Sequence, residues 1–386
     1  MSYGYLTGVL IFGALVLLTL MAPRRPRLLA GLAYRAASVY NEAPFPFIYL
    51  LVISSLGPIT DGRLASLAGG IVLGLGLLVI LGFGVIAWRG ARDRPAVEEA
   101  LDEGLGIGWR ERTDPELIVE VPGRPPIANI LLMPFVLRPR QVQRVRNVSY
   151  GDAGRHNLLD IYFHRSQPEG APVLVYFHGG GFYGGRKSIE GRALLFRLAR
   201  RGWVTISANY RLRPHAGFSE HLVDVKKVVA WVREHGHEYG ADPSTLFLSG
   251  GSAGGTLSSI AALTQNDPRY QPGFEEAETS VTGVASLYGW YGGYYEMGGA
   301  ESEFGVLGHD AAGAAPFFIA HGRNDTLAAV ETARRFVAHL RSGSPNPVVY
   351  VELEHGQHAF DLFHSFRFSA VVDGVEAFAS AVRSKG

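Results

Sequence analysis

Gly250-Gly251-Ser252-Ala253-Gly254-Gly255 follows the apolar run Leu246-Phe247-Leu248, and this stretch decides the fold of the chain. An apolar strand that runs into Gly-x-Ser-x-Gly and then into a helix is the pattern of a nucleophile elbow, a sharp turn that lifts the serine hydroxyl out of a sheet. Glycines two residues either side of the serine let strand and helix approach closely, because a Cβ there would collide across the turn. The pattern predicts a helix that begins near Ala253 and points its first N–H groups at the space above Ser252.

The chain around this turn alternates between strand-like and helix-like stretches from Val145 onward. Apolar runs predict strands over residues 145–150, 158–163, 173–177, 203–208, 246–249, 283–287, 316–320 and 348–353. Helical patterns fall at 189–200, within 216–239, near 328–340 and at the end of the chain. The first two strands form an opening hairpin, and the alternation that follows predicts an α/β fold with a doubly wound, mostly parallel sheet.

A glycine run stands at the carboxyl end of the strand over 173–177, in His178-Gly179-Gly180-Gly181-Phe182. Open α/β sheets bind ligands at this end of their strands, and glycines there can turn backbone N–H groups into the cleft. Two such donors, together with the N–H of Ala253, would form an oxyanion hole. The alternative is a flexible loop without chemistry.

A serine hydroxyl needs a base to remove its proton, and the base needs a group that orients it. Asp325 follows the apolar strand Phe317-Phe318-Ile319, where the acid of a triad is expected. His358 follows the strand Val349-Tyr350-Val351 and is the predicted base, with His355 as its rival. The order Ser, Asp, His, each after its own strand, is specific for one arrangement of a catalytic triad.

Residues 146 to about 383 resemble the hormone-sensitive-lipase-like branch of the α/β-hydrolase fold, a group of bacterial carboxylesterases. The matching motifs extend over the whole region: His178 to Phe182, Asn209-Tyr210-Arg211-Leu212, Asp242-Pro243, Gly250 to Gly255, Asp325-Thr326-Leu327 and His358-Ala359-Phe360. The resemblance implies that Ser252 is the nucleophile, Asp325 the acid and His358 the base. It also implies that the oxyanion donors are Gly180, Gly181 and Ala253. With a membrane anchor, the chain is similar to the transmembrane esterases or lipases of mycobacteria.

Residues 1–90 have no counterpart in the soluble members and contain three uncharged runs. We expect a transmembrane helical region with spans at about 3–22, 43–60 and 64–88. A cleaved signal peptide is the alternative for the first run, but its positive charges come after the apolar core and not before it. The second run contains three prolines, so a re-entrant or interfacial segment is the alternative there. In the third run, Gly70 and Gly74 have the spacing of closely packed membrane helices.

Residues 91–145 are expected to form a linker or cap-like segment before the catalytic domain at 146–386. Val97 to Leu101 predicts a short polar helix. The apolar run Ile127 to Leu137 is too short to span a membrane and contains Pro134, which favours a position on the membrane surface or a flap over the soluble domain. A plain buried segment is the alternative.

Arginines after the first and third apolar runs bear on orientation. Arg24, Arg25, Arg27 and Arg35 mark one loop as cytoplasmic, and Arg89, Arg92 and Arg94 mark another. Three spans with the N-terminus outside satisfy both loops and leave the catalytic domain in the cytoplasm, which we predict. Two spans would export it.

The predicted function is that of a membrane-anchored serine hydrolase that cleaves carboxylic esters through an acyl-enzyme. The expected partners are a small-molecule or lipid ester and the membrane. A net charge of +1 gives no field that would attract nucleic acid. No cofactor is expected, since no cluster of His, Asp and Glu has metal-ligand spacing. Hydrolysis of N-acyl or amide bonds is the enzymatic alternative, and a non-catalytic membrane-bound interaction module is the remote one.

The stretch Tyr288 to Gly299 is short for a cap and rich in glycine and aromatic residues. Trp290, Tyr291, Tyr294 and Tyr295 would crowd the acyl pocket into a shallow slot. Each methylene contributes about 0.8 kcal/mol only while it is buried, so the predicted preference is for acyl groups of roughly two to eight carbons.

Overall fold

Eight strands form one sheet in the order β1-β2-β4-β3-β5-β6-β7-β8 in the computed structural model, which describes residues 3–62, 66–117, 125–295 and 297–384. The strands are β1 Val142–Ser149, β2 Leu158–His164, β3 Ala171–Phe177, β4 Val204–Ala208, β5 Ala241–Gly251, β6 Gly283–Leu287, β7 Phe317–Gly322 and β8 Val348–Leu353. β2 pairs antiparallel with both β1 and β4, and the remaining neighbours are parallel. The predicted fold class, a doubly wound and mostly parallel sheet, is confirmed.

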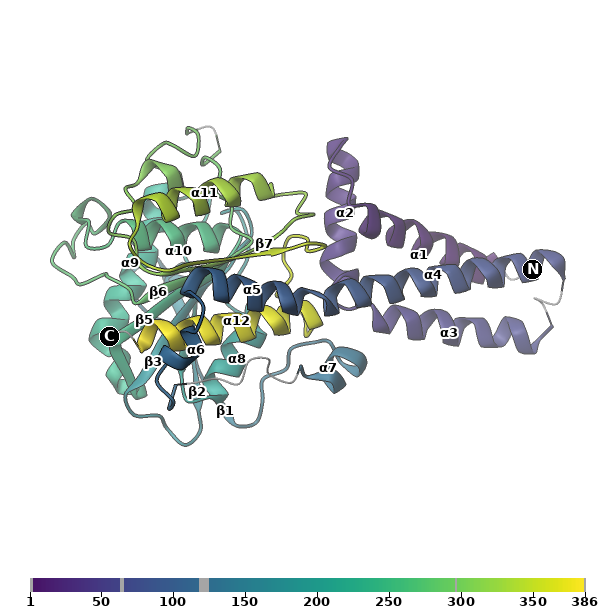
Figure 1. The fold of residues 1–386 in the computed structure, drawn as a ribbon, viewed down its shortest axis with the longest axis horizontal. Helices are drawn as coiled ribbons and strands as arrows, with labels where there is room; N and C mark the ends of the chain where they lie inside the picture. The colour runs from purple at the N-terminus through teal and green to yellow at the C-terminus, as the bar shows by residue number, and fades with distance from the viewer. Residues whose placement is uncertain (1–2, 63–65, 118–124, 296, 385–386) are drawn as a thin grey trace.

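Helices cover both faces of this sheet, and each face has its own buried cluster (Figure 1). α9 Phe218–His235, α10 Ala253–Leu263 and α11 Val330–Gly343 lie on one face; α5 Asp93–Leu105, α8 Arg192–Arg200 and α12 Phe366–Arg383 lie on the other. Alternate residues of β3 divide between the two sides, Val173 and Val175 in the first cluster and Leu174 and Tyr176 in the second. This period of two is what a strand buried on both faces requires.

The segment expected to be a linker or cap contributes α5 to the outer helix layer. α5 contacts β8 and α12, and its buried residues include Val97, Leu101 and Leu105. Gly104 is what permits the close contact, because a Cβ there would lie 2.7 Å from the Cα of Val349. Val97, Leu101 and Leu105 lie four residues apart on one face of α5, and this face packs on the sheet. The helix was expected to be polar because its other residues are mostly charged. Two short helices follow, α6 Trp109–Arg112 and α7 Ile127–Leu132.

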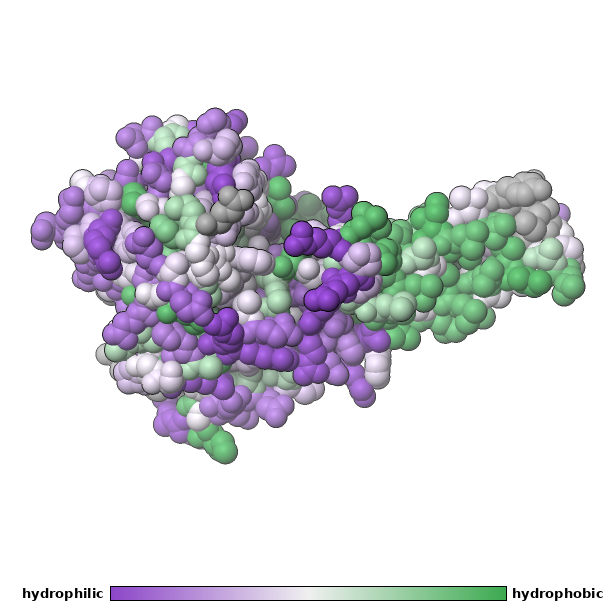
Figure 2. All heavy atoms as spheres, turned by 90° about the horizontal axis from the view of Figure 1, so that it is seen from above, coloured by the Kyte–Doolittle hydropathy of each residue, from purple (hydrophilic) through white to green (hydrophobic). Residues whose placement is uncertain are grey.

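An arm of three helices extends from the sheet domain: α1 Tyr3–Met21, α3 Phe45–Thr60 and α4 Leu67–Ala91 (Figure 1). Its surface is apolar along most of its length, which Figure 2 shows as a continuous green region. The windows Gly4–Met21 and Leu67–Leu105 are long and apolar enough to cross a membrane. α3 passes the same test only together with α2 Arg27–Tyr40, from which it is bent by 86°. α2 itself lies across the base of the arm, next to the sheet domain (Figure 1).

The helices of the arm pack through Gly76 and Gly82 of α4. A Cβ at Gly76 would lie 2.5 Å from the Tyr5 hydroxyl, and one at Gly82 would lie 2.6 Å from Cγ1 of Val16. Gly70 and Gly74, whose spacing suggested a packing face, have nothing within 4 Å of an added Cβ. The buried face of α4 instead follows its own three-and-four periodicity, in which Gly76 lies and Gly74 does not.

A buried cluster of charges connects the arm to the sheet domain. Arg367 at the start of α12 forms ion pairs with Glu42, which joins α2 to α3, and with Asp93 at the start of α5. The distance from Nε of Arg367 to Oδ2 of Asp93 is 2.6 Å, and all three residues are buried. A guanidinium enclosed by two carboxylates holds the base of the arm at a fixed position on the domain.

Candidate active site

Ser252 occupies the turn between β5 and α10 with a left-handed backbone, at φ +52°. The glycines around it meet a steric requirement. A Cβ at Gly254 would lie 2.0 Å from the carbonyl oxygen of Phe177, and one at Gly250 would lie 2.5 Å from the carbonyl carbon of Gly254. The turn therefore fits only glycine at these two positions, and α10 begins at Ala253 as expected.

Three side chains from separate strand ends meet at this turn. Nε2 of His358 lies 2.9 Å from Oγ of Ser252, and Nδ1 of His358 lies 2.6 Å from Oδ2 of Asp325. Asp325 follows β7 and His358 follows β8, so the parallel sheet brings both to the carboxyl end of β5. His355 lies elsewhere: its carbonyl oxygen accepts from Nδ2 of Asn41 at 3.5 Å, and across the described residues no hydrogen bond joins its ring to Ser252 or Asp325.

The Asp325 carboxylate is held ionised by its surroundings. Burial alone would raise its pKa, but the charge and hydrogen bond of His358, together with His321 and the N–H of Ala328, hold the pKa below its usual value. The N–H groups of Leu327 and Ala328 donate to Oδ1 at 2.8 and 2.7 Å. An ionised carboxylate can only accept, so Nδ1 of His358 carries the proton and Nε2 is free to accept the proton of the serine hydroxyl.

The glycine loop after β3 faces Ser252. The N–H groups of Gly180, Gly181 and Ala253 donate to no protein group in the part of the chain that the structure describes. Gly180 has φ +109° and Gly181 has φ +60°, and a Cβ at Gly180 would lie 2.4 Å from the carbonyl oxygen of Gly184. The hydroxyl of Tyr295 donates to the carbonyl oxygen of Gly181. These contacts fix the loop with three donors available to a ligand above the serine.

Glu190 supports this loop and also lines the cavity above Ser252. Its Oε2 accepts the N–H of Gly179 at 2.5 Å. Burial and the neighbouring Asp361 raise the pKa of Glu190 above its usual value, which favours its protonated form near neutral pH. A neutral acid at this position holds the loop without placing a negative charge beside the three N–H donors.

A cavity of about 540 Å³ lies above Ser252, and its walls come from several parts of the chain, including the glycine loop after β3. The cap stretch contributes Trp290, Tyr294 and Tyr295. Tyr291, expected beside them, is instead buried behind the wall, where its hydroxyl lies 2.7 Å from Oγ of Ser286. α2 contributes Tyr34, whose ring meets that of His358 edge-on with centroids 5.9 Å apart.

Sequence reasoning did not identify Tyr34, Glu190 or Tyr288 as site residues. Tyr288 follows β6 directly and its ring lies 4.8 Å from that of His358, so its place after a strand was an available signal. Tyr34 is about 220 residues from Ser252 in the chain, and Glu190 stands before a helix with no motif around it. No local pattern indicates either of them.

The described residues contain no group of three or more His, Asp or Glu arranged to hold a metal ion.

Comparison with known proteins gives matches over most of the chain. A family model described as BD-FAE matches residues 159–294. The probable carboxylic ester hydrolase LipM of Mycobacterium tuberculosis is 38% identical over 316 residues, which cover 73% of this chain and 71% of LipM. Esterases LipQ and LipC of the same organism are 32% and 34% identical, over 77% and 75% of this chain and 76% and 77% of their own lengths.

Solved structures of esterases share the fold. A truncated form of a carbohydrate esterase from gut microbiota has a TM-score of 0.53 at 18% identity and covers 61% of this chain and 96% of its own. Thermogutta terrifontis esterase 2 phosphorylated by paraoxon has a TM-score of 0.50 at 22% identity, covering 63% and 88%. At these identities the likeness concerns the fold alone.

Proposed function

Because the chain belongs to the α/β-hydrolase family of carboxylic ester hydrolases that includes these mycobacterial proteins, we propose that Ser252, His358 and Asp325 are its catalytic triad. The chain is an ester hydrolase, and what we propose is how and where it works. The observation that supports the triad most strongly is the continuous contact from Ser252 through His358 to the ionised Asp325, beside three free N–H groups.

In the proposed mechanism, Oγ of Ser252 attacks the ester carbonyl while Nε2 of His358 takes its proton. Asp325 stabilises the imidazolium and keeps Nδ1 protonated. The N–H groups of Gly180, Gly181 and Ala253 bind the oxyanion of the tetrahedral intermediate. His358 then gives its proton to the departing alcohol. Water, activated by the same histidine, hydrolyses the acyl-enzyme and returns Ser252 to its free form.

Labelling with a fluorophosphonate tests the nucleophile directly. The full-length protein in detergent should be modified at Ser252, located by peptide mass spectrometry, and Ser252→Ala should remain unlabelled. A protein that takes up no probe, or takes it up at another serine, would contradict the triad. Parallel assays with butyrate esters and matching butyranilides decide between ester and amide hydrolysis, and we expect the esters to be cleaved far faster.

We propose a preference for acyl groups of roughly two to eight carbons, since methylenes beyond the buried part of the cavity add no binding energy. The aromatic wall of Trp290, Tyr294 and Tyr295 supports this limit. Values of kcat/KM over an ester series from acetyl to palmitoyl test it. A rise that continues to palmitoyl would contradict it.

We also propose that α1, α3 and α4 span a membrane, with the N-terminus outside and the catalytic domain in the cytoplasm. The arginine-rich segments after α1 and α4 both lie at the end of the arm next to the catalytic domain, as the positive-inside rule requires. Reporter fusions after Gly386 test the orientation, and an exported reporter would contradict it.

A further inference from the structure

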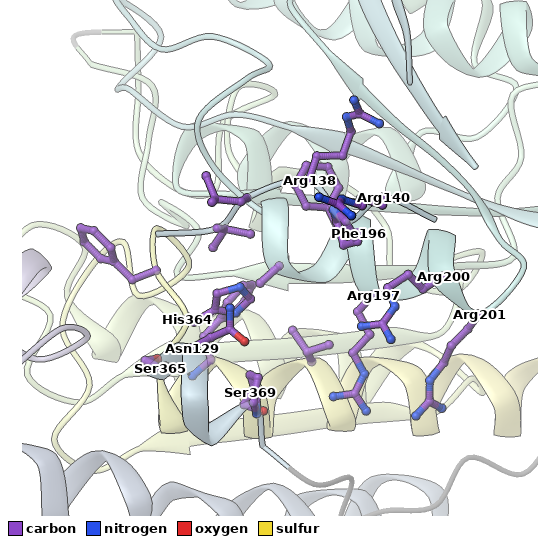
Figure 3. A pocket seen from close by; sticks show the side chains of 18 residues that line it. Asn129, Arg138, Arg140, Phe196, Arg197, Arg200, Arg201, His364, Ser365 and Ser369 are labelled. Carbon is purple, nitrogen blue, oxygen red and sulfur yellow. Dashed lines mark hydrogen bonds between the residues drawn. The ribbon is translucent and has the colours of Figure 1, made fainter. Parts of the chain in front are cut away.

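A second cavity, of about 630 Å³, lies between α7, α8 and α12 (Figure 3). It shares no lining residue with the cavity above Ser252. Its walls carry five arginines and neither Asp nor Glu; the arginines are Arg138, Arg140, Arg197, Arg200 and Arg201. A lining with positive side chains and no negative ones favours an anionic ligand.

Carboxylates behind the wall neutralise only part of this charge. Asp373 and Glu376 of α12 are both buried and are shared among three guanidinium groups, those of Arg94, Arg197 and Arg201. Arg138 donates to the carbonyl oxygen of Val142, a neutral group. Arg140 and Arg200 are exposed and form no ion pair with the described residues. The cavity therefore keeps an excess of positive charge.

The rest of the lining is both polar and apolar. Ser369 lines the cavity, and its buried Oγ has no hydrogen-bond partner among the described residues. Phe196, Phe368 and Val372 supply apolar surface beside it. Free arginines in the lining fit a phosphate, whose oxygens accept charge-assisted hydrogen bonds from guanidinium groups. Apolar surface at the same site fits a ligand that also carries hydrocarbon.

The edge of the cavity lies on the side of the domain that faces the arm. α7 forms this edge and contacts α3 of the arm. Apolar side chains at and after α7 are exposed, namely those of Ile127, Leu132, Met133, Phe135 and Leu137. In Figure 1, α7 lies near the base of the arm, as α2 does. With the arm in a bilayer, these side chains would reach the boundary between headgroups and acyl chains.

We propose that this cavity binds the phosphate headgroup of an anionic phospholipid, with the glycerol and upper acyl chains against the exposed residues of α7. The inference rests on the proposed membrane anchoring and not on the proposed catalytic triad. Arg140 and Arg200 bind the phosphate, since their guanidinium groups have no other anion.

Lipid binding by the full-length protein tests the proposal. Protein purified in detergent is titrated with phosphatidylglycerol or phosphatidylcholine, and bound lipid is counted by native mass spectrometry. We expect phosphatidylglycerol to bind at least about tenfold more tightly, because phosphatidylcholine has the same phosphate but adds the positive charge of choline beside the arginines. The double variant Arg140→Gln/Arg200→Gln should lose about that factor. The matched control Arg146→Gln/Arg155→Gln removes the same charge from exposed positions outside the cavity and should bind like the wild type.

Equal affinity for the two lipids, or equal loss in the two double variants, would overturn the proposal. Inorganic phosphate is the third ligand tested: if it displaces phosphatidylglycerol at comparable concentration, the site takes a soluble phosphate and the lipid assignment is wrong.

Hydrolysis of a soluble butyrate ester should stay unchanged in both double variants, which shows that they are folded. A wild-type protein that does not hydrolyse the butyrate ester would count against the triad alone. Extraction of the wild type from membranes by alkaline carbonate would count against the membrane anchoring alone.

Discussion

Ser252 has the left-handed backbone that a nucleophile elbow imposes, and the residues around it are constrained accordingly. The carbonyl oxygens of Phe177 and Gly254 lie where a Cβ at Gly254 or Gly250 would be. Backbone strain at one residue is thus maintained by close packing of strand, turn and helix. The result is a hydroxyl that meets His358 at 2.9 Å without any further movement.

Alanine substitution of each of the two nearby histidines, His358 and His355, distinguishes the proposed base from its rival. His358→Ala should lower kcat/KM for a butyrate ester by three orders of magnitude or more, as loss of a triad member does. His355→Ala should keep most of the activity, because its ring bonds to neither Ser252 nor Asp325. Steady-state kinetics on both variants checks this. Inactivity of His355→Ala with an active His358→Ala would reverse the assignment.

Glu190 should set the alkaline limit of activity. Burial and Asp361 raise the pKa of Glu190, which favours its neutral form at pH 7; its ionisation at higher pH would oppose the oxyanion that we propose the same loop binds. Activity of the wild type should therefore fall by several-fold between pH 7.5 and 9.5. Glu190→Gln keeps an acceptor for the N–H of Gly179 and cannot ionise, so its rate should stay level over that range. Parallel pH profiles that fall together would contradict this role.

At this scale, sequence alone could predict Ser252, Asp325 and His358 as candidates, because each stands just after an apolar strand in a parallel sheet. It could not predict Glu190 or Tyr34. Their places depend on how a loop and a helix of another region pack on the sheet, and neither packing leaves a pattern in the nearby sequence.

Among the elements, α2 connects the arm to the cavity above Ser252. α2 supplies Tyr34 to the cavity above Ser252, and its Ala30 carbonyl accepts from the Thr326 hydroxyl at 3.1 Å, directly beside Asp325.

Apolar runs predicted the helices of the arm, but glycine spacing did not predict how they pack. Gly-xxx-Gly spacing selects Gly70 and Gly74, whereas the neighbours of α4 fix its orientation through Gly76 and Gly82.

Two glycines of α4 offer a matched test of this packing. Gly82→Val places a side chain against Val16 of α1 and should destabilise the protein by about 1–3 kcal/mol, the usual effect of overpacking. Gly74→Val makes the same change in the same helix where an added Cβ meets nothing within 4 Å, so it should be tolerated. Thermal unfolding in detergent measures both. Equal melting temperatures for the two variants would contradict the packing.

In the whole molecule, the arm and the catalytic domain form one unit through the buried group of Glu42, Arg367 and Asp93. Arg367→Met leaves two buried carboxylates without a cationic partner and should destabilise the protein by about 3–5 kcal/mol. The triple variant Glu42→Gln/Asp93→Asn/Arg367→Met removes all three charges and should recover most of that loss. Denaturation of the full-length variants gives both values. A triple variant as unstable as the single one would show that shape, and not charge, joins the two regions.

With the arm spanning a bilayer, as we propose, the position of Tyr34 makes the thickness of that bilayer a variable of catalysis. α4 has 25 residues and reaches about 37 Å, so a thinner bilayer tilts the arm to keep its apolar surface covered. Tilt at the base of the arm moves α2, and with it the Tyr34 wall of the cavity. Turnover of one soluble ester in nanodiscs of 14-, 18- and 22-carbon lipids should pass through a maximum where hydrocarbon thickness matches the arm. Truncating Tyr34 to alanine should flatten that dependence, since the wall that the membrane moves is then absent.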